Sequence, residues 1–214
     1  MILFFKKLKA KSKKQKAYRL NRGFTYVELI VVLSIFAIMS SIAIFNYGKF
    51  QAKVDIKNLA NDIALQIVQA QKDAMSGKWN INALTGWKPS YGVYFDIANK
   101  YNFIYFADFL DVNQKYDSGT NSCNTSGSEC LENINITKGN FIQKIGYFSG
   151  NSSSKITTPV DITFTRPNSG AVFYFDNAIQ SSVSYMQITI ASPQGPTACI
   201  QIYPSGRVQI GQCQ

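Results

Sequence analysis

Few side chains in this sequence are spaced for catalysis. The chain contains no histidine, so neither a serine–histidine nor a cysteine–histidine nucleophile can form. No pair of carboxylates spaced for acid–base work and no glycine-rich phosphate loop is apparent along the chain. These features favour a non-enzymatic protein with no cofactor.

Four cysteines form two close pairs in the C-terminal half. An even number of cysteines, in a chain with an export-type segment, favours disulfides over metal binding. Neither pair has zinc-finger spacing and no histidine is present, so we expect no zinc site. Four cysteines allow three connectivities, and proximity favours Cys123–Cys130 and Cys199–Cys213. The first bridge would pin a Ser/Asn/Gly-rich loop, and the second would tie down the C-terminus.

One segment offers a weak candidate for calcium binding. Oxygen-bearing side chains occur at Asp108, Asp111, Asn113 and Asp117, somewhat as in a calcium loop. Lys115 stands where a ligand would be needed, and no glutamate closes the loop at the expected distance. We therefore favour a solvated polar turn and expect no metal.

The positive charge of the chain lies at its N-terminus. The chain has 22 basic and 12 acidic residues, and nine of the basic residues lie within residues 1–23. Residues 24–214 contain the remaining 13 basic residues and all 12 acidic residues, so this part of the chain is almost neutral. A general nucleic-acid-binding domain would keep a basic surface, and we do not expect nucleic acid as a partner.

An apolar segment follows the basic one. Residues 24–45 contain a single charge, Glu28, and as a helix these 22 residues would span about 33 Å, enough for a bilayer. The basic residues before it place the N-terminus in the cytoplasm and the C-terminus outside. A secretory signal peptide would have its cleavage site after the apolar run, whereas the obvious processing residue here, Gly23, precedes it.

The block from Arg22 to Leu33 (RGFTYVELIVVL) closely resembles the prepilin signature of type IV pilins and type II secretion pseudopilins. The resemblance implies that a membrane peptidase cleaves between Gly23 and Phe24 and methylates the new amine of Phe24. It also implies that Glu28 is an assembly residue. A carboxylate in an apolar layer is costly unless paired, and a neighbouring subunit's Phe24 amine would pair with it.

Beyond the anchor the sequence predicts an α+β domain. Apolar residues at three- and four-residue steps extend the helix to residue 78, and aromatic-rich alternating runs then predict antiparallel strands. We expect strands over residues 91–96, 101–106, 141–148, 160–165, 171–175, 185–191, 197–203 and 207–210. The family resemblance leaves roughly 107–158 as family-variable loop, apart from the strand at 141–148. The expected organisation is leader 1–23, anchor helix 24–45, amphipathic helix 46–78 and β-rich head 79–214.

Several stretches of this half resemble the H-type minor pseudopilins, among them Tyr91–Phe95 and Pro204–Val208. Together the resemblances imply a structural subunit, minor rather than major, of a type IV pilus or pseudopilus. Its partners would be other pilin or pseudopilin subunits, the prepilin peptidase, the inner-membrane assembly platform and the lipid bilayer. Its location would be the cytoplasmic membrane and then a periplasmic or surface filament.

Three alternatives stay open at this point. A major pilin would share all these features. A DNA-uptake or adhesive tip pilin would use basic residues such as Arg207, but the second arginine expected there is Gln209, and several cations are needed for useful affinity. An unprocessed membrane-anchored domain would keep residues 1–23 and never polymerise.

Overall fold

The computed structural model describes residues 23–117, 123–125, 127–150, 152–211 and 213 of the 214-residue chain. The chain divides after Phe45 into two compact units, and each is described by itself. One helix, α1 (Tyr26–Ser76), contributes residues to both. Apart from Gly23, the expected leader lies outside the described residues.

In the first unit, α1 exposes apolar side chains on all its sides. The large apolar side chains from Phe24 to Ile44 are exposed, and the least exposed, Ile30, still has 47% of its surface accessible. A helix in water normally hides its apolar face. By length and composition α1 can cross a membrane, and none of its apolar window is buried inside the protein. The helix is therefore a candidate membrane anchor.

In the second unit, one face of α1 is buried. Its buried residues recur at three- and four-residue steps, as the amphipathic pattern predicts. The helix ends at Ser76, and Gly77 follows at a positive φ of 70°, which suits glycine at a helix end. The predicted helix is thus confirmed, with two residues fewer at each end. The buried residues are Ala52, Ile56, Ala60, Ile63, Ile67, Ala70 and Ala74.

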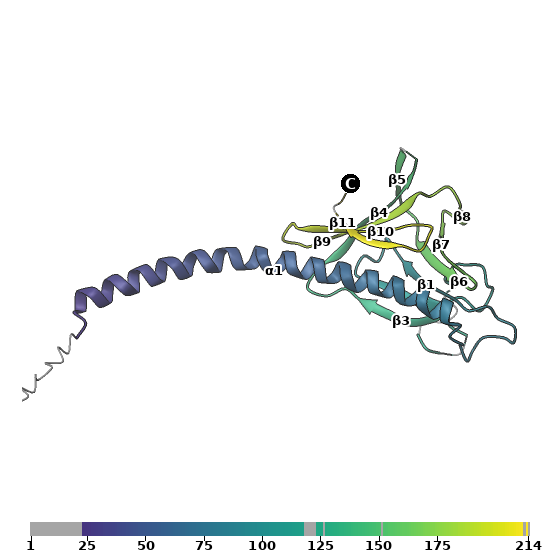
Figure 1. Ribbon diagram of the computed structural model, residues 1–214, viewed down its shortest axis with the longest axis horizontal. Helices are drawn as coiled ribbons and strands as arrows, with labels where there is room; N and C mark the ends of the chain where they lie inside the picture. The colour runs from purple at the N-terminus through teal and green to yellow at the C-terminus, as the bar shows by residue number, and fades with distance from the viewer. Residues whose placement is uncertain (1–22, 118–122, 126, 151, 212, 214) are drawn as a thin grey trace, which may run out of the picture. The chain divides into compact units, whose positions relative to one another are not determined.

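The strands of the second unit form two antiparallel sheets (Figure 1). The six-stranded sheet has the order β3-β2-β1-β6-β7-β8 and the five-stranded sheet the order β11-β10-β9-β4-β5. The first sheet comprises β1 (Ser90–Phe95), β2 (Asn102–Ala107), β3 (Cys130–Asn135), β6 (Val160–Thr165), β7 (Asn168–Phe175) and β8 (Ala178–Gln180). The second comprises β4 (Phe141–Ser149), β5 (Ser152–Ile156), β9 (Tyr185–Ala191), β10 (Thr197–Ile202) and β11 (Val208–Gly211).

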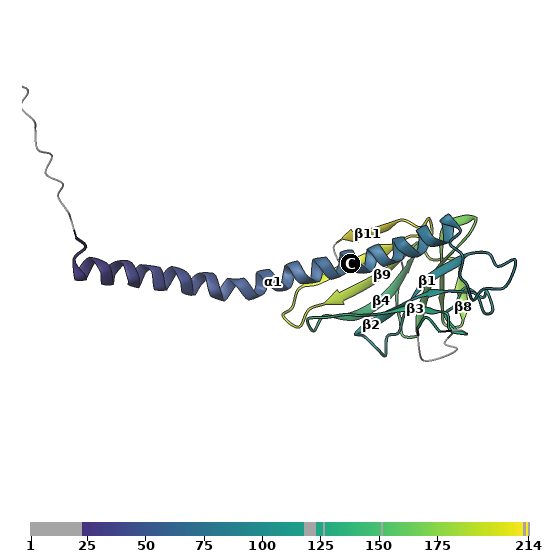
Figure 2. The same cartoon turned by 90° about the horizontal axis from the view of Figure 1, so that it is seen from below.

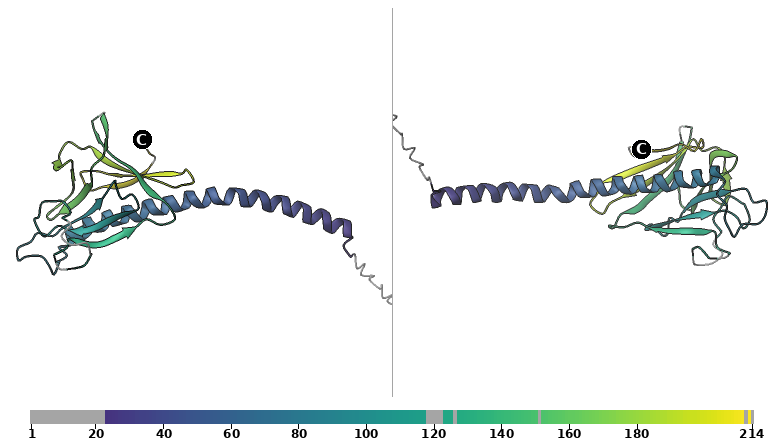
Figure 3. Two further views of the ribbon diagram at one scale, coloured as in Figure 1. Left: turned by 180° about the vertical axis from the view of Figure 1, so that it is seen from behind. Right: turned by 60° about the horizontal axis from the view of Figure 1, so that its bottom comes forward.

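A single hydrophobic core joins the buried face of α1 to both sheets. The views in Figures 2 and 3 show strands of both sheets gathered beside the second half of α1. The apolar residues of β9 alternate with polar ones, but Met186–Ala191 are all buried, so this strand is covered on both faces and not on one alone. Small residues on α1, such as Ala60 and Ala70, let the helix backbone lie close to the strands.

The α+β prediction is confirmed, with differences in detail. The predicted hairpin forms, since β1 pairs with β2 and Val93 lies opposite Tyr105. Three strands were missed, β3, β5 and β8, and two of them lie in the stretch that we expected to be loop. Their sequences, CLENIN, SSSKI and AIQ, are short and lack a clear apolar alternation, and all three are edge strands. Edge strands need little apolar surface, so patterning does not reveal them.

Candidate functional site

The first turn of α1 is closed by a side-chain cap. The backbone N–H of Glu28 donates a hydrogen bond of 3.3 Å to Thr25 Oγ1, and the N–H of Leu29 reaches the Thr25 carbonyl at 3.1 Å. Thr25 is therefore the N-cap and Glu28 the third helical residue, the spacing of a capping box. Sequence reasoning missed this cap, although Thr-x-x-Glu is a recognisable signal.

Glu28 is exposed in this turn, and it is the acidic residue there. A carboxylate at this position interacts favourably with the positive end of the helix dipole. Gly23 and Phe24 are exposed as well, and a methyl group added at Gly23 would meet nothing within 4 Å. The three residues expected to serve processing and assembly therefore share an accessible, capped helix start.

Exposed apolar residues also occur along α1 within the second unit. Tyr47, Phe50, Val54, Leu65 and Val68 are exposed, and at 100° per residue they project from the side of the helix opposite its buried face. Phe50 and Leu65 leave about two-thirds of their surface accessible, 65% and 66%. The five residues form two groups, since Lys57, Asn58 and Asn61 lie on the same side of the helix between Val54 and Leu65, and exposed apolar groups of this kind are candidates for an interaction surface.

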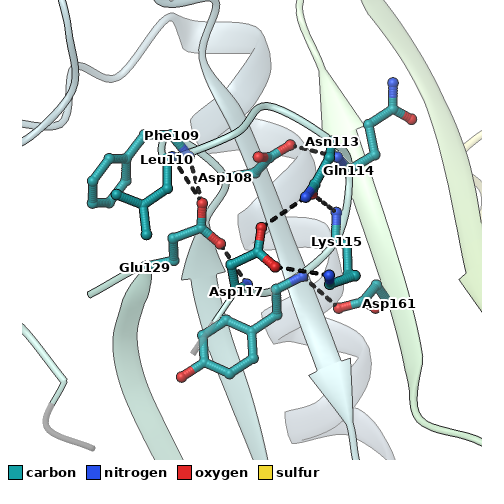
Figure 4. Close-up of polar contacts among 10 residues, drawn as sticks. Asp108, Phe109, Leu110, Asn113, Gln114, Lys115, Asp117, Glu129 and Asp161 are labelled. Atoms are coloured by element: carbon teal, nitrogen blue, oxygen red, sulfur yellow. Dashed lines mark hydrogen bonds and ion pairs between the residues drawn. The ribbon is translucent and has the colours of Figure 1, made fainter. Parts of the chain in front are cut away.

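A buried acidic network holds the loop at residues 108–117 (Figure 4). Glu129 Oε1 accepts the N–H groups of Phe109 and Leu110, both at 2.9 Å, and its Oε2 accepts that of Asp117 at 2.7 Å. Of the backbone donors of this loop, the N–H of Asp108 bonds to the Ser90 carbonyl of β1, and the buried donors beyond it need other acceptors. The carboxylate supplies them.

Two further carboxylates act in the same way. Asp108 Oδ2 accepts the N–H of Gln114, and Asp161 Oδ1, from β6, accepts the N–H of Tyr116, both at 2.9 Å. Neither Glu129 nor Asp161 was singled out from the sequence. Asp161 did leave a signal, since an acid between Val160 and Ile162 interrupts an apolar strand.

Burial raises the pKa of all three carboxyl groups. The pKa of Asp161 rises to about 8, that of Glu129 to about 7 and that of Asp108 to about 6, in each case because burial disfavours the charged form. The backbone hydrogen bonds act in the opposite direction, and so does Lys115 on Asp161. Near neutral pH these three groups therefore titrate, whereas carboxyl groups with an ordinary pKa are already ionised.

The weak calcium candidate residues do not form a joint ligand set. Asp108 is buried and bonded to Gln114, whereas Asp111 is exposed. Asp117 is paired with Lys115 at 2.8 Å and accepts a hydrogen bond from Asn113 at 2.7 Å. No group of three or more acidic, histidine or cysteine ligands occurs among the described residues.

The structure joins Cys123 to Cys130 and Cys199 to Cys213, with Cα atoms 4.5 and 5.1 Å apart. Cys130 is the first residue of β3, so the first bridge fastens the preceding loop to the edge of the six-stranded sheet. Cys199 lies within β10, so the second bridge holds the chain just after β11. Cross-links of this kind stabilise a domain by restricting its unfolded chain.

Arg207 is exposed and lies over an aromatic ring. Its guanidinium carbon lies 3.9 Å from the centre of the Tyr203 ring, a cation–π arrangement. Gln209, the neighbouring position, lies opposite Gln201 across β10 and β11. This geometry gives no second cation beside Arg207 on the strand.

Comparison with known proteins identifies a sequence motif at the capped helix start. A family model described as the prokaryotic N-terminal methylation motif matches residues 18–44. The chain carries a prepilin methylation motif. No curated protein and no solved structure matches the chain.

The motif supports a type IV pilin-like protein, a subunit of the pilin or pseudopilin kind. It implies processing by a peptidase and assembly with other pilins, and it points to a structural rather than an enzymatic role. Gly23, Phe24, Thr25 and Glu28 all lie inside the matched region. Residues 1–17 and 45–214 fall outside the match.

Proposed function

We propose that this pilin-like protein is a minor structural subunit of a type IV pilus or pseudopilus. The anchor helix of residues 24–45 inserts in the cytoplasmic membrane with the head domain outside. A prepilin peptidase cuts between Gly23 and Phe24 and methylates the Phe24 amine, and the assembly platform passes the subunit into a filament.

The observation that carries this proposal is an exposed apolar helix whose capped first turn follows the accessible Gly23–Phe24 junction. The helix exposes apolar surface on every side, so it needs an apolar surrounding, first lipid and then neighbouring helices. In a filament the only charges inside that layer would be Glu28 and the Phe24 amine. Pairing them between subunits removes the cost of both and sets the stagger.

The exposed apolar groups of α1 in the second unit support assembly as well. Tyr47, Phe50, Val54, Leu65 and Val68 offer a neighbouring helix two apolar groups beyond the anchor. Such groups on a head domain in water are unfavourable unless another subunit covers them. We expect the filament to bury them.

The test is the mature N-terminus of membrane-extracted protein, measured by intact mass and N-terminal peptide mass spectrometry. We expect a species that starts at N-methylated Phe24. Gly23→Ala should block the cut, and Gly48→Ala is the matched control, since a methyl group at either position meets nothing within 4 Å. A chain that keeps its leader, in cells that process other prepilins, would leave an unprocessed anchored domain as the answer.

The abundance of the processed chain in sheared filaments separates the remaining alternatives. A minor subunit should be a small fraction of the filament protein, and a major pilin the bulk of it. A DNA-uptake tip subunit should retain DNA in a salt-dependent manner. Retention that persists in the purified full-length chain and fails with Arg207→Ala would favour that role over a purely structural one.

A further inference from the structure

We propose that the head domain carries a binding site for a neutral saccharide, in the cavity between the loop after α1 and the start of β3. The inference goes beyond filament assembly and does not depend on it. The cavity has a volume of about 450 Å³, within the range of about 300–1,000 Å³ that is typical of small-molecule sites. Its lining residues all belong to the second unit.

One wall of the cavity is aromatic: Trp79, Tyr91 and Tyr105 line it, and Trp87, which is not in the lining, contacts Trp79 and Tyr91. Trp79 has 53% of its surface accessible and lies edge-to-face on Trp87, with ring centres 5.8 Å apart. Trp87 is buried, and its Nε1–H donates to the Asp108 carbonyl at 2.6 Å. Tyr91 continues the row 5.8 Å from Trp87. An indole braced in this way offers a flat apolar surface with little entropy to lose on binding.

The rest of the lining is mostly polar, with Ile81 and Leu131 as its apolar members. Asn80, Asn82, Asn124 and Glu132 contribute amides and a carboxylate, and Asn80 Oδ1 is bonded to the Asn82 N–H at 2.9 Å, which fixes that turn. Amides both donate and accept, whereas a carboxylate only accepts. The Cys123–Cys130 bridge holds the wall that carries Asn124 next to β3.

The charges around the cavity select for a neutral ligand. Lys78 is the cation in the lining, and its Nζ lies 2.6 Å from Asp73 Oδ2, so its charge is already paired. An anion would meet Glu132 without a free cation. Asn82, Asn124 and Glu132 face water in the free protein. A purely apolar ligand would cover these groups and leave them unpaired, at a cost of about 1–3 kcal/mol for each group that it buries.

A pyranose ring is complementary to both the aromatic wall and the polar part of the lining. Its C–H face packs on an indole, and its neighbouring hydroxyls donate to a carboxylate while exchanging hydrogen bonds with amides. A single exposed tryptophan is not the cage of several rings that holds a quaternary ammonium. The geometry therefore favours a sugar over a cationic ligand.

The experiment uses the full chain in a polyoxyethylene detergent, because detergents with sugar head groups would compete. Chitotriose, mannotriose and lactose are titrated while tryptophan fluorescence and saturation-transfer NMR are recorded. The chain has two tryptophans, and their rings are in contact, so a change in emission reports this pair beside the cavity. We expect at least one of these sugars to bind.

Trp79→Ala should weaken binding about tenfold or more, equivalent to ~1.4 kcal/mol, and Trp79→Phe should retain most of it. Leu84→Ala is the matched control, since Leu84 is exposed in the same loop but does not line the cavity, and it should change affinity less than twofold. No binding by any sugar of the panel overturns the proposal. So does an equal loss in both alanine variants, or saturable binding of choline instead.

Discussion

The hydroxyl of Tyr105, in β2, donates a hydrogen bond of 2.6 Å to Asp73 Oδ2, near the end of α1. Asp73 is buried, and it also accepts from Lys78 Nζ at 2.6 Å and from Gln69 Nε2 at 2.7 Å. Burial, and then the bond to Asp73, raise the pKa of Tyr105, so its hydroxyl keeps its proton. The contact fastens α1 to the six-stranded sheet.

Tyr105→Phe should therefore destabilise the head domain. The substitution removes one donor from a buried carboxylate but leaves Lys78 and Gln69 in place, so we expect a loss of about 1–3 kcal/mol in the free energy of unfolding. Urea unfolding of the full chain in detergent measures it. Tyr101→Phe is the control, since Tyr101 is exposed and should lose less than about 0.5 kcal/mol. Equal losses in the two variants would contradict the role given to Asp73.

The cap at Thr25 and the charge at Glu28 can be separated by substitution. Thr25→Ala removes the acceptor for the Glu28 N–H, at a cost of about 1 kcal/mol of helix stability, but keeps the carboxylate. Glu28→Gln keeps the helix and removes the charge. If Glu28 pairs with a neighbour's amine, Glu28→Gln should reduce cross-linking between differently tagged copies severalfold, and Thr25→Ala should reduce it less.

The control for this pair is Asp62→Asn, which neutralises an exposed acid of the same helix in the second unit. Cross-linking should be unchanged by it. Comparable loss in Asp62→Asn and Glu28→Gln would mean that net charge, not a specific pairing, governs assembly. Loss in Thr25→Ala as large as in Glu28→Gln would assign the effect to the helix start.

The buried carboxylates predict that the head domain is more stable in mild acid. A carboxyl whose pKa is raised on folding binds protons more tightly in the folded state, so stability falls as pH rises from its ordinary pKa to its folded pKa. For Asp161, Glu129 and Asp108 the folded values are about 8, 7 and 6. Thermal unfolding followed by circular dichroism should give a Tm several degrees higher at about pH 5 than at about pH 8.

Because the chain contains no histidine, no side chain with an ordinary pKa titrates between about pH 5 and pH 8. The change in Tm over this range therefore reports the buried carboxyl groups. Asp161→Asn should flatten the dependence, since the amide oxygen can still accept the Tyr116 N–H. Lys115 and Asp117 also face this site and stay in place. Asp111→Asn, at an exposed loop position, should leave the slope unchanged. A Tm that rises between about pH 5 and pH 8 would contradict the burial argument.

The sequence predicted the helix and most strands because long-range burial left local patterns there. Alternation in Tyr185–Ala191 fixed β9 to the residue, and three- and four-residue steps fixed the buried face of α1. The division of the strands between two sheets was not predicted, because strand pairing depends on contacts far apart in sequence. Tyr91 of β1 and Phe164 of β6, for example, lie opposite each other although many residues separate them in the chain.

The functional residues, too, could be predicted only where their signal is local in the sequence. Gly23, Phe24 and Glu28 lie within six residues and carry their own local signature. The acidic network draws Asp108, Glu129 and Asp161 from three separate segments, so the loop around Asp108 was read as a solvated turn. The structure corrects that reading, since Asp108 is fully buried and the backbone donors of its loop are held by carboxylates.

Gly206 marks where the turn between β10 and β11 approaches α1. It has a positive φ of 82°, and a Cβ there would collide with Gln71 Nε2 and the Ser169 carbonyl oxygen. Those two atoms are joined by a hydrogen bond of 2.8 Å, so neither can yield freely. Gly195, in the turn before β10, also has a positive φ, of 102°, but open space around it.

The two glycines therefore separate backbone strain from packing. Gly195→Ala should cost about 1–2 kcal/mol of stability, since an L-residue pays only for the left-handed backbone. Gly206→Ala adds a collision with Ser169 of β7 and with Gln71 of α1, and we expect a larger loss, about 3–4 kcal/mol. Urea unfolding of both variants gives the difference. Similar losses would mean that Gly206 serves only its own turn, and that the turn is free to move away from α1.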